Sequence, residues 1–217
     1  FAIILLMGTL SLIGLSMKGA TQKASSESLG SITNSFSMQI NRRTNPGTPR
    51  GAGNLRGEDI EKISQVEGIT SSIKRINAIA DILDHEIIET EETLQNQSPE
   101  RAKYFKNTLM VTGVNDSSKE DKFVSGAYKL VQGDHLTDKD KNQILMHEDL
   151  AKKNGLKVGD KVRLKSNLYD ADNEKGANET VEVTIKGLFS GKNQAPLTYA
   201  QELYEDTLIS DLDTAAK

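Results

Sequence analysis

Hydrophobic side chains are concentrated at the start of the chain, where residues 1–17 carry no charge. The polar interruptions in this run are small residues, which membrane helices tolerate well. At 1.5 Å per residue these positions would form roughly 25 Å of helix, close to the ~30 Å hydrocarbon core of a bilayer. The pattern therefore predicts that residues 1–17 are the end of a transmembrane helix.

An atypical secretory signal and a buried core helix are the two alternatives for this stretch. A secretory signal begins with basic residues, whereas the first charged residue here is Lys18. A core helix carries a polar face, whereas residues 2–6 are apolar on every side. Both alternatives therefore fit the pattern less well than a membrane helix.

The hydrophobic pattern changes after the membrane helix. Residues 18–35 are polar and rich in Ser, which indicates a stalk or linker. Apolar residues then alternate over residues 36–40, the pattern of a half-buried strand. Residues 41–54 are full of turn formers and predict a long loop. Ile60, Ile63 and Val66 would share one face of the helix that follows.

The next segments alternate between strand and helix patterns. Residues 69–83 suit a strand or a helix, and we favour a strand because Ile and Thr are frequent there. Residues 84–103 form an acidic stretch. In its later part, Ser98 and Pro99 are the start signal of a short helix. Residues 108–114 predict a strand.

The C-terminal half has the clearest pattern. Residues 144–165 predict a strand, a short helix ended by Gly155, a turn and a second strand. Residues 181–189 alternate and should pair with that second strand across the acidic loop 166–180. Residues 207–217 predict a strand and then a helix that begins at an Asp cap.

Composition limits the possible partners and chemistry. The net charge of −4 gives no reason to expect nucleic acid as a partner. The chain contains no Cys, which excludes disulfides and thiolate metal sites and suits an exported domain. Many cytosolic chains also lack Cys, so this feature permits an extracytoplasmic location without establishing it.

Several short stretches resemble nucleotide-binding or calcium-binding motifs, but each lacks a required residue or spacing. The glycines of residues 51–57 are one residue too far apart for a dinucleotide-binding turn. Residues 187–193 lack the P-loop spacing and end in Asn193, where Ser or Thr must hold Mg²⁺. Residues 170–176 carry alternating acids, but Gly176 comes one position late for a calcium loop.

The remaining candidates for catalysis also have ordinary explanations. Ser71 and Lys74 have the spacing of an acylating pair, but the companion motifs of penicillin-recognising enzymes are absent. The acids of residues 84–92 predict a solvated face. The histidines lack metal-ligand spacing and are expected at the surface; they are His85, His135 and His147. We therefore expect no catalytic residue, no cofactor and no metal ligand, and we do not expect an enzyme.

A series of motifs between residues 133 and 187 resembles the extracytoplasmic core domain of MacB/FtsX-type ABC transporter permeases. That family carries a G-x-x-L turn, a short helix reading L-A-x-x-x-G-L, a V-G-D-x-V-x-L strand and a return strand ending in V-x-G. The matching residues here are Gly133, Leu136, Leu150, Ala151, Gly155, Leu156, Val158, Gly159, Asp160, Val162, Leu164, Ile185 and Gly187. Residues 55–69 resemble the first helix of the family, and residues 1–17 match its first membrane helix.

The resemblance implies an α+β fold with two subdomains after the membrane helix and stalk. A porter-like subdomain built from βαβ elements would comprise residues 36–116 and 190–217, and it would continue past the end of this chain. A smaller, hairpin-rich α+β subdomain would be inserted between them as residues 117–189. The resemblance does not explain loop 41–54 or the acidic stretch 84–103.

The resemblance also implies a function. Such permeases dimerise with an identical or related permease, and a separate cytoplasmic P-loop ATPase supplies the energy. The outer domains would move with the dimer and export peptides, lipids or toxic amphiphiles, including antimicrobial peptides or drugs, by mechanotransmission. The alternative is a membrane-anchored extracellular binding or recruitment module, including FtsX-like activation of a cell-wall hydrolase.

The expected location follows from the same resemblance. Residues 1–17 would anchor the protein in the cell membrane, with the main domain on the extracytoplasmic side. The Lys-rich composition without Cys favours a Gram-positive cell surface.

Overall fold

The computed structural model describes residues 57–96, 98–169, 176–193 and 202–217. These residues belong to one compact unit, Arg56–Lys217. The predicted membrane helix 1–17, stalk 18–35, strand 36–40 and loop 41–54 lie outside them. Within the described residues, no helix has both the length and the apolar character needed to cross a bilayer.

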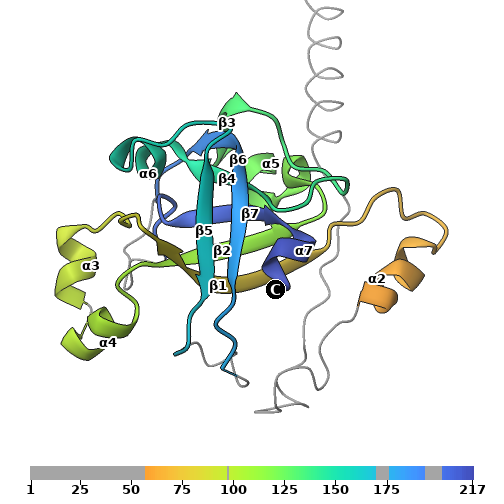
Figure 1. Ribbon diagram of the computed structural model, residues 1–217. Helices are drawn as coiled ribbons and strands as arrows, with labels where there is room; N and C mark the ends of the chain where they lie inside the picture. Colours follow the sequence, from red (N-terminus) through yellow and green to blue (C-terminus); the bar gives the residue numbers. More distant parts are fainter. Residues whose placement is uncertain (1–56, 97, 170–175, 194–201) are drawn as a thin grey trace, which may run out of the picture. The chain divides into compact units, whose positions relative to one another are not determined.

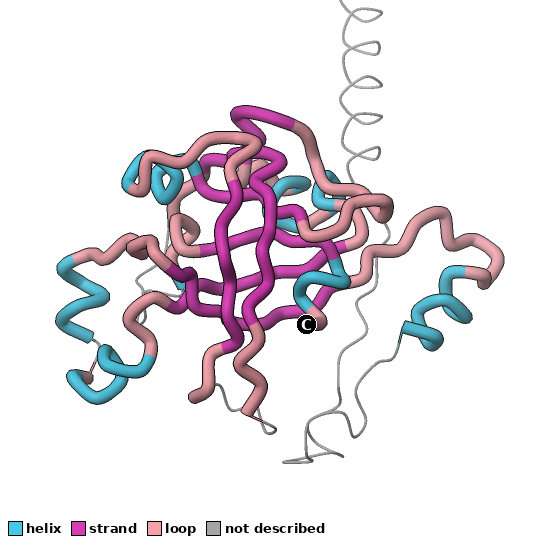
Figure 2. Tube along the Cα trace, viewed as in Figure 1, coloured by secondary structure: helices cyan, strands magenta, loops and turns pink. Residues whose placement is uncertain are grey.

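The unit combines a seven-stranded sheet with short helices, which confirms the expected α+β class. Figure 2 shows the strands grouped together and the helices around them. The strands are β1 (Arg75–Leu83), β2 (Thr108–Val114), β3 (Lys129–Gly133), β4 (Gln143–His147), β5 (Lys161–Ser166), β6 (Thr180–Ser190) and β7 (Thr207–Asp211). The helices are α2 (Gly57–Ser64), α3 (Glu91–Asn96), α4 (Pro99–Tyr104), α5 (Asp121–Val124), α6 (Glu148–Lys153), α7 (Leu212–Ala215) and the 3₁₀ turn η1 (Ser117–Lys119).

The sheet closes on itself. Its strand order is β3-β6-β4-β7-β2-β1-β5, and β5 pairs with β6 as well as with β1. The first part of β6 forms the hairpin with β5, and its second part pairs with β4 and β3. Figure 1 accordingly shows β5 and β6 running across β1, β2 and β7. The closed ring leaves β3 as a strand that hydrogen-bonds to one neighbour.

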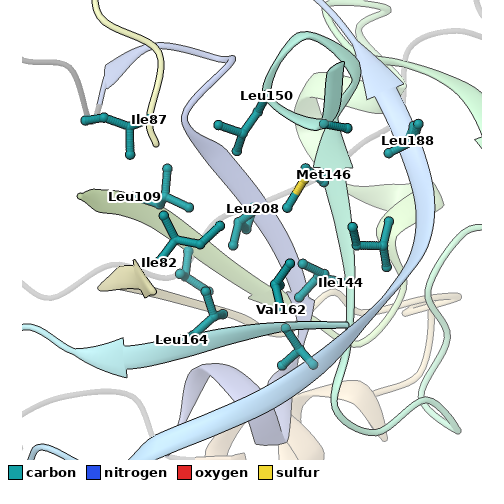
Figure 3. Close-up of a cluster of buried hydrophobic side chains, with 14 residues drawn as sticks. Ile82, Ile87, Leu109, Ile144, Met146, Leu150, Val162, Leu164, Leu188 and Leu208 are labelled. Carbon is teal, nitrogen blue, oxygen red and sulfur yellow. The ribbon is translucent and has the colours of Figure 1, made fainter. Parts of the chain in front are cut away.

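The larger hydrophobic cluster fills the interior of the closed sheet (Figure 3). Val162 and Leu164 point into it, as their alternation predicts, and are 2% and 5% exposed. Leu150 of α6 packs into the same cluster, so α6 covers part of the interior. Burying each of these side chains contributes about 1.5–3 kcal/mol to folding.

A second cluster lies on the opposite face of the strands. Val114, Leu145 and Ile209 alternate with interior residues of β2, β4 and β7, and therefore point outward. The segment between β2 and β4 covers them, and it contributes Tyr128 and Leu136 to the cluster. The sheet is thus buried on both faces in this region.

Most of the predicted elements are confirmed. The strand prediction for residues 69–83 corresponds to β1, and Ser98 and Pro99 begin α4 as expected. Gly155 adopts φ +65°, the left-handed conformation expected at the end of α6, and the Leu156 amide donates back to Ala151.

Other elements differ from the sequence-based expectation. The local sequence pattern did not predict α3, η1, α5 or β3, which are short. The predicted helix around Ile60 forms as α2, but Val66 lies beyond its end and is 56% exposed. The two-subdomain division stays a prediction. Strands from residues 36–116 and 190–217 join strands from residues 117–189 in the one sheet.

Candidate functional site

The segments that lead into β1 and follow β7 lie at one edge of the sheet. Arg75 at the start of β1 pairs in register with Val114 of β2, and Val114 pairs with Asp211 at the end of β7. Neighbouring strands are about 4.8 Å apart, so the two segments are roughly 10 Å from each other. We call this place the shared edge, defined by Arg75, Val114 and Asp211.

The segment before β1 is fastened to the end of β2. Oδ1 of Asn115 accepts a hydrogen bond from the Lys74 amide at 2.7 Å, and Nδ2 of Asn115 donates to the Ser72 carbonyl at 3.2 Å. The Lys74 ammonium also pairs with Glu61 of α2 at 3.0 Å. One Asn side chain thereby fixes the direction in which the chain reaches the sheet.

Arg75 joins β1 to α5. Its guanidinium donates to Glu120 at 3.3 Å and to Asp121 at 2.8 Å. Glu120 is only 4% exposed, and its other oxygen accepts from the Lys122 amide at 2.7 Å as the N-cap of α5. Because a buried carboxylate without a cationic partner is costly, Arg75 is the residue that makes this position of Glu120 tolerable.

Lys122 continues this arrangement toward the strand β7. Its ammonium donates to the Tyr128 hydroxyl at 3.1 Å and lies 4.6 Å from the centre of the Tyr204 ring. Burial lowers the pKa of Lys122, Glu120 raises it and Arg75 lowers it. Burial also raises the pKa of the Tyr128 hydroxyl, which therefore remains protonated. These contacts connect α5 to the residues just before β7.

Asp211 organises the other side of the shared edge. Oδ1 accepts from the Thr214 amide at 3.0 Å, which caps α7 as the sequence predicts. Oδ2 accepts from the Thr214 hydroxyl at 2.7 Å and from the Gln143 amide at 3.0 Å. A single carboxylate that is 3% exposed therefore joins β7, α7 and β4.

A Ser–His pair lies beside this edge, and the sequence did not reveal it. The Ser117 hydroxyl accepts from the Leu136 amide at 2.8 Å, and its oxygen lies 2.9 Å from Nδ1 of His135. Burial lowers the pKa of His135, while Asp116 and Asp134 raise it. Ser117 is 0% exposed, so its hydroxyl cannot reach a substrate. The pair holds the turn before Leu136 in place.

The prediction that all three histidines lie at the surface is wrong for His147. This side chain is 1% exposed, and its Nδ1 accepts from the Asp149 amide at 3.1 Å as the N-cap of α6. Its Nε2 lies 2.8 Å from the Gly191 carbonyl, which fixes the proton on Nε2. Both ring nitrogens have partners in the fold, which is why an imidazole can be buried here.

The other sequence candidates do not assemble into a reactive site. The Lys74 ammonium pairs with Glu61, and Ser71 is exposed. The described acids of residues 84–91 are exposed, as expected of a solvated face. No group of three or more His, Cys, Asp or Glu residues among the described positions could hold a metal ion.

Comparison with known families identifies the chain. The family of MacB-like periplasmic core domains matches residues 1–215. The chain belongs to this family. No curated protein gives a significant match. The resemblance inferred from the motifs is thus confirmed, and the shared edge belongs to an extracytoplasmic domain of an ABC transporter permease.

The residues of the shared edge were not predicted as a site. Arg75 and Glu120 are 45 residues apart in sequence, and nothing in either segment indicates that they meet. The signal that was present is local: Glu120 and Asp211 each stand directly before a short helix, where a carboxylate caps the first turn.

Proposed function

We propose that this domain couples ATP-driven motion of a permease dimer to the export of peptides, lipids or toxic amphiphiles. The partners would be a cytoplasmic P-loop ATPase and a second permease subunit, identical or related. Residues 1–17 would anchor the domain in the membrane. The Gram-positive location stays a prediction from composition.

The shared edge is the observation that carries this proposal. β2 lies between β1 and β7 and is hydrogen-bonded along both of them. A displacement of the segment before β1 therefore reaches the segment after β7 through a continuous ladder of backbone hydrogen bonds. Arg75, Glu120 and Lys122 add a side-chain connection from β1 through α5 to Tyr204, just before β7. A domain that transmits motion requires such a stiff link between its two connections.

The first experiment is a mild-detergent purification of the full-length parent protein from its native membranes. We expect a P-loop ATPase to co-purify and its ATP turnover to depend on the complex. In the Arg75→Gln variant, we expect export and substrate-stimulated turnover to fall several-fold while basal ATP turnover is retained, because the link between β1 and α5 is weakened.

Arg163→Gln is the matched control. Arg163 pairs with Asp84 just beyond the other end of β1, and both side chains are exposed. This variant removes the same charge from β5, which pairs with the far end of β1, and it does not touch the shared edge, so export should be unchanged. A protein that purifies without an ATPase, or equal losses in the two variants, would contradict the proposal.

One observation favours the alternative recruitment function. Leu168 and Tyr169 are 48% and 57% exposed, and the Tyr169 ring packs 3.9 Å from that of Tyr104. The buried Asn167 holds this turn by accepting from the Tyr169 amide and donating to Asp81. Large apolar side chains presented on a fixed turn are suited to bind a protein partner. If the domain recruits a wall hydrolase, Tyr169→Ala should reduce that co-purification and leave ATP turnover unchanged.

A further inference from the structure

Residues 84–90 form a strap that begins with a bend and connects β1 to α3 without joining the sheet. Side chains satisfy its backbone. Asn154 accepts from the Glu86 amide at 2.9 Å and donates to the Glu86 carbonyl at 2.8 Å. The Lys153 ammonium donates to the Ile87 carbonyl at 2.8 Å. The strap can therefore detach without breaking a strand pairing.

The strap covers one side of the interior cluster. Ile87 is 4% exposed and belongs to that cluster. Figure 3 shows Ile87 at the edge of the cluster. The next residue, Ile88, donates its amide to Oδ1 of Asp206 at 2.7 Å. Asp206 precedes β7, so this one hydrogen bond joins the strap to the last strand of the described sheet.

Asp206 is an unusual anchor because half of its carboxyl group lacks a partner. The side chain is 0% exposed, and Oδ1 is the oxygen that receives the Ile88 amide. Among the described residues, neither Oδ2 of Asp206 nor Oε2 of the neighbouring Glu205 has a hydrogen-bond partner, although both atoms are buried. If both groups were ionised, these two neighbouring carboxylates would repel each other, and their buried oxygens would lack solvation.

The charged groups around Asp206 come from each element packed on it. Glu205 lies on its own segment, Glu89 on the strap and Lys153 on α6. Lys153 also pairs with the exposed Glu86 at 3.4 Å and donates to the strap, so its charge is shared. The acids outnumber the single cation, which favours a neutral carboxyl group at Asp206.

We propose that the strap is a pH-sensitive latch that stays closed while the Asp206 carboxyl group carries a proton and loosens as that proton is lost. Release would expose Ile87 and one side of the interior cluster. An extracytoplasmic domain meets the pH of the cell exterior directly, so external acidity would tighten the latch.

The pH window follows from linkage. Burial raises the pKa of Asp206 to about 8 in the closed state, compared with the usual 3.8 that a released, hydrated carboxyl would have. The Ile88 amide and Lys153 lower this pKa, whereas Glu205 and Glu89 raise it. The closed state thus binds the proton more tightly. Strap opening should increase by up to tenfold per pH unit between about 4 and 8, and should level off above 8.

Hydrogen exchange of the full-length protein in detergent tests this proposal. Protection factors of residues 86–88, corrected for intrinsic exchange, should fall steadily from pH 5 to pH 8 and then become constant. Asp206→Asn keeps an acceptor for the Ile88 amide and remains neutral, so its strap should show no such slope. In parallel, the carboxyl carbon signal of Asp206 in the unsubstituted protein should titrate far above pH 4.

Asp140→Asn is the matched control. Asp140 is a half-buried acid that pairs with Lys186 at 2.7 Å, and hydrogen bonds from Lys186 and Thr137 outweigh burial and lower its pKa. This variant should keep the slope of the strap. The proposal would be overturned by strap protection that is independent of pH, by the same slope in Asp206→Asn, or by an Asp206 signal that titrates near pH 4. The carbon signal decides the question even if Asp206→Asn does not fold.

Discussion

At the scale of the residue, Gly113 shows how closely α7 packs against the sheet. Gly113 lies on β2 and its missing side chain would point at the methyl group of Ala215 on α7. A Cβ atom built on Gly113 would clash with Cβ of Ala215 and crowd the Asp211 carbonyl. The Gly is therefore needed for close approach of the helix beside the shared edge.

Gly113→Ala should lower the free energy of unfolding by about 1–3 kcal/mol, because the new methyl group overfills a packed contact. Chemical denaturation of the two proteins measures the difference. Gly113→Ala combined with Ala215→Gly should recover part of the loss, since the second change removes the clashing methyl. The contrary result is that Ala215→Gly costs the same stability in the Gly113→Ala protein as it does alone. That result would show that the contact between the two residues is not the cause.

At the scale of the element, the short helices depend on side chains that cap their first turns. α5, α6 and α7 contain four to six residues and cannot persist through helix propensity alone. Glu120, His147 and Asp211 cap them, and each of these residues is also bound to another part of the sheet or its covering segment. Capping thereby positions each helix in addition to ending it.

Asp211→Ala should lower the free energy of unfolding by about 1–3 kcal/mol, because the amides of the buried Thr214 and the half-buried Gln143 lose their acceptor. Thermal and chemical unfolding measure this loss. Asp213→Ala is the control, since Asp213 lies on the same helix and is exposed. We expect it to change stability by about 0.5 kcal/mol or less. Equal effects of the two substitutions would show that Asp211 acts only through its charge.

At the scale of the whole molecule, the closed sheet joins segments that are far apart in the chain. The porter-like strands β7, β2 and β1 are neighbours in the ring, and they meet strands of the predicted inserted subdomain at two places, β7 with β4 and β1 with β5. The interior cluster likewise draws on β1, β2, β4, β5, β6 and β7. Neither set of strands can bury its interior face without the other.

The described unit should therefore unfold in a single cooperative transition. Far-ultraviolet circular dichroism and the fluorescence of a Trp placed at Tyr128 would report on the strands and on the outer cluster, respectively. The chain has no Trp of its own, so this probe is unambiguous. Coincident denaturation curves are expected. Two separated transitions would instead support independently stable subdomains.

Much of this fold is present in the sequence because its signals are local. The alternation in β5 and β6, the glycine that ends α6 and the caps of α4 and α7 each depend on residues within a few positions of one another. The same local motifs carried the family resemblance. The exposed position of Val66 was missed because α2 ends before that residue, and the burial of His147 was missed because its partner Gly191 is 44 residues away.

Sequence alone thus determined most of the strands and helices and the family of the chain, since hydrophobic period and turn chemistry are properties of short stretches. Only the tertiary structure decided that β5 closes the sheet by pairing with both β1 and β6. It also decided that Arg75 meets Glu120 at the shared edge, and that Asp206 is buried under the strap. Those features depend on strand order and on contacts across tens of residues, which the local pattern of a chain does not encode.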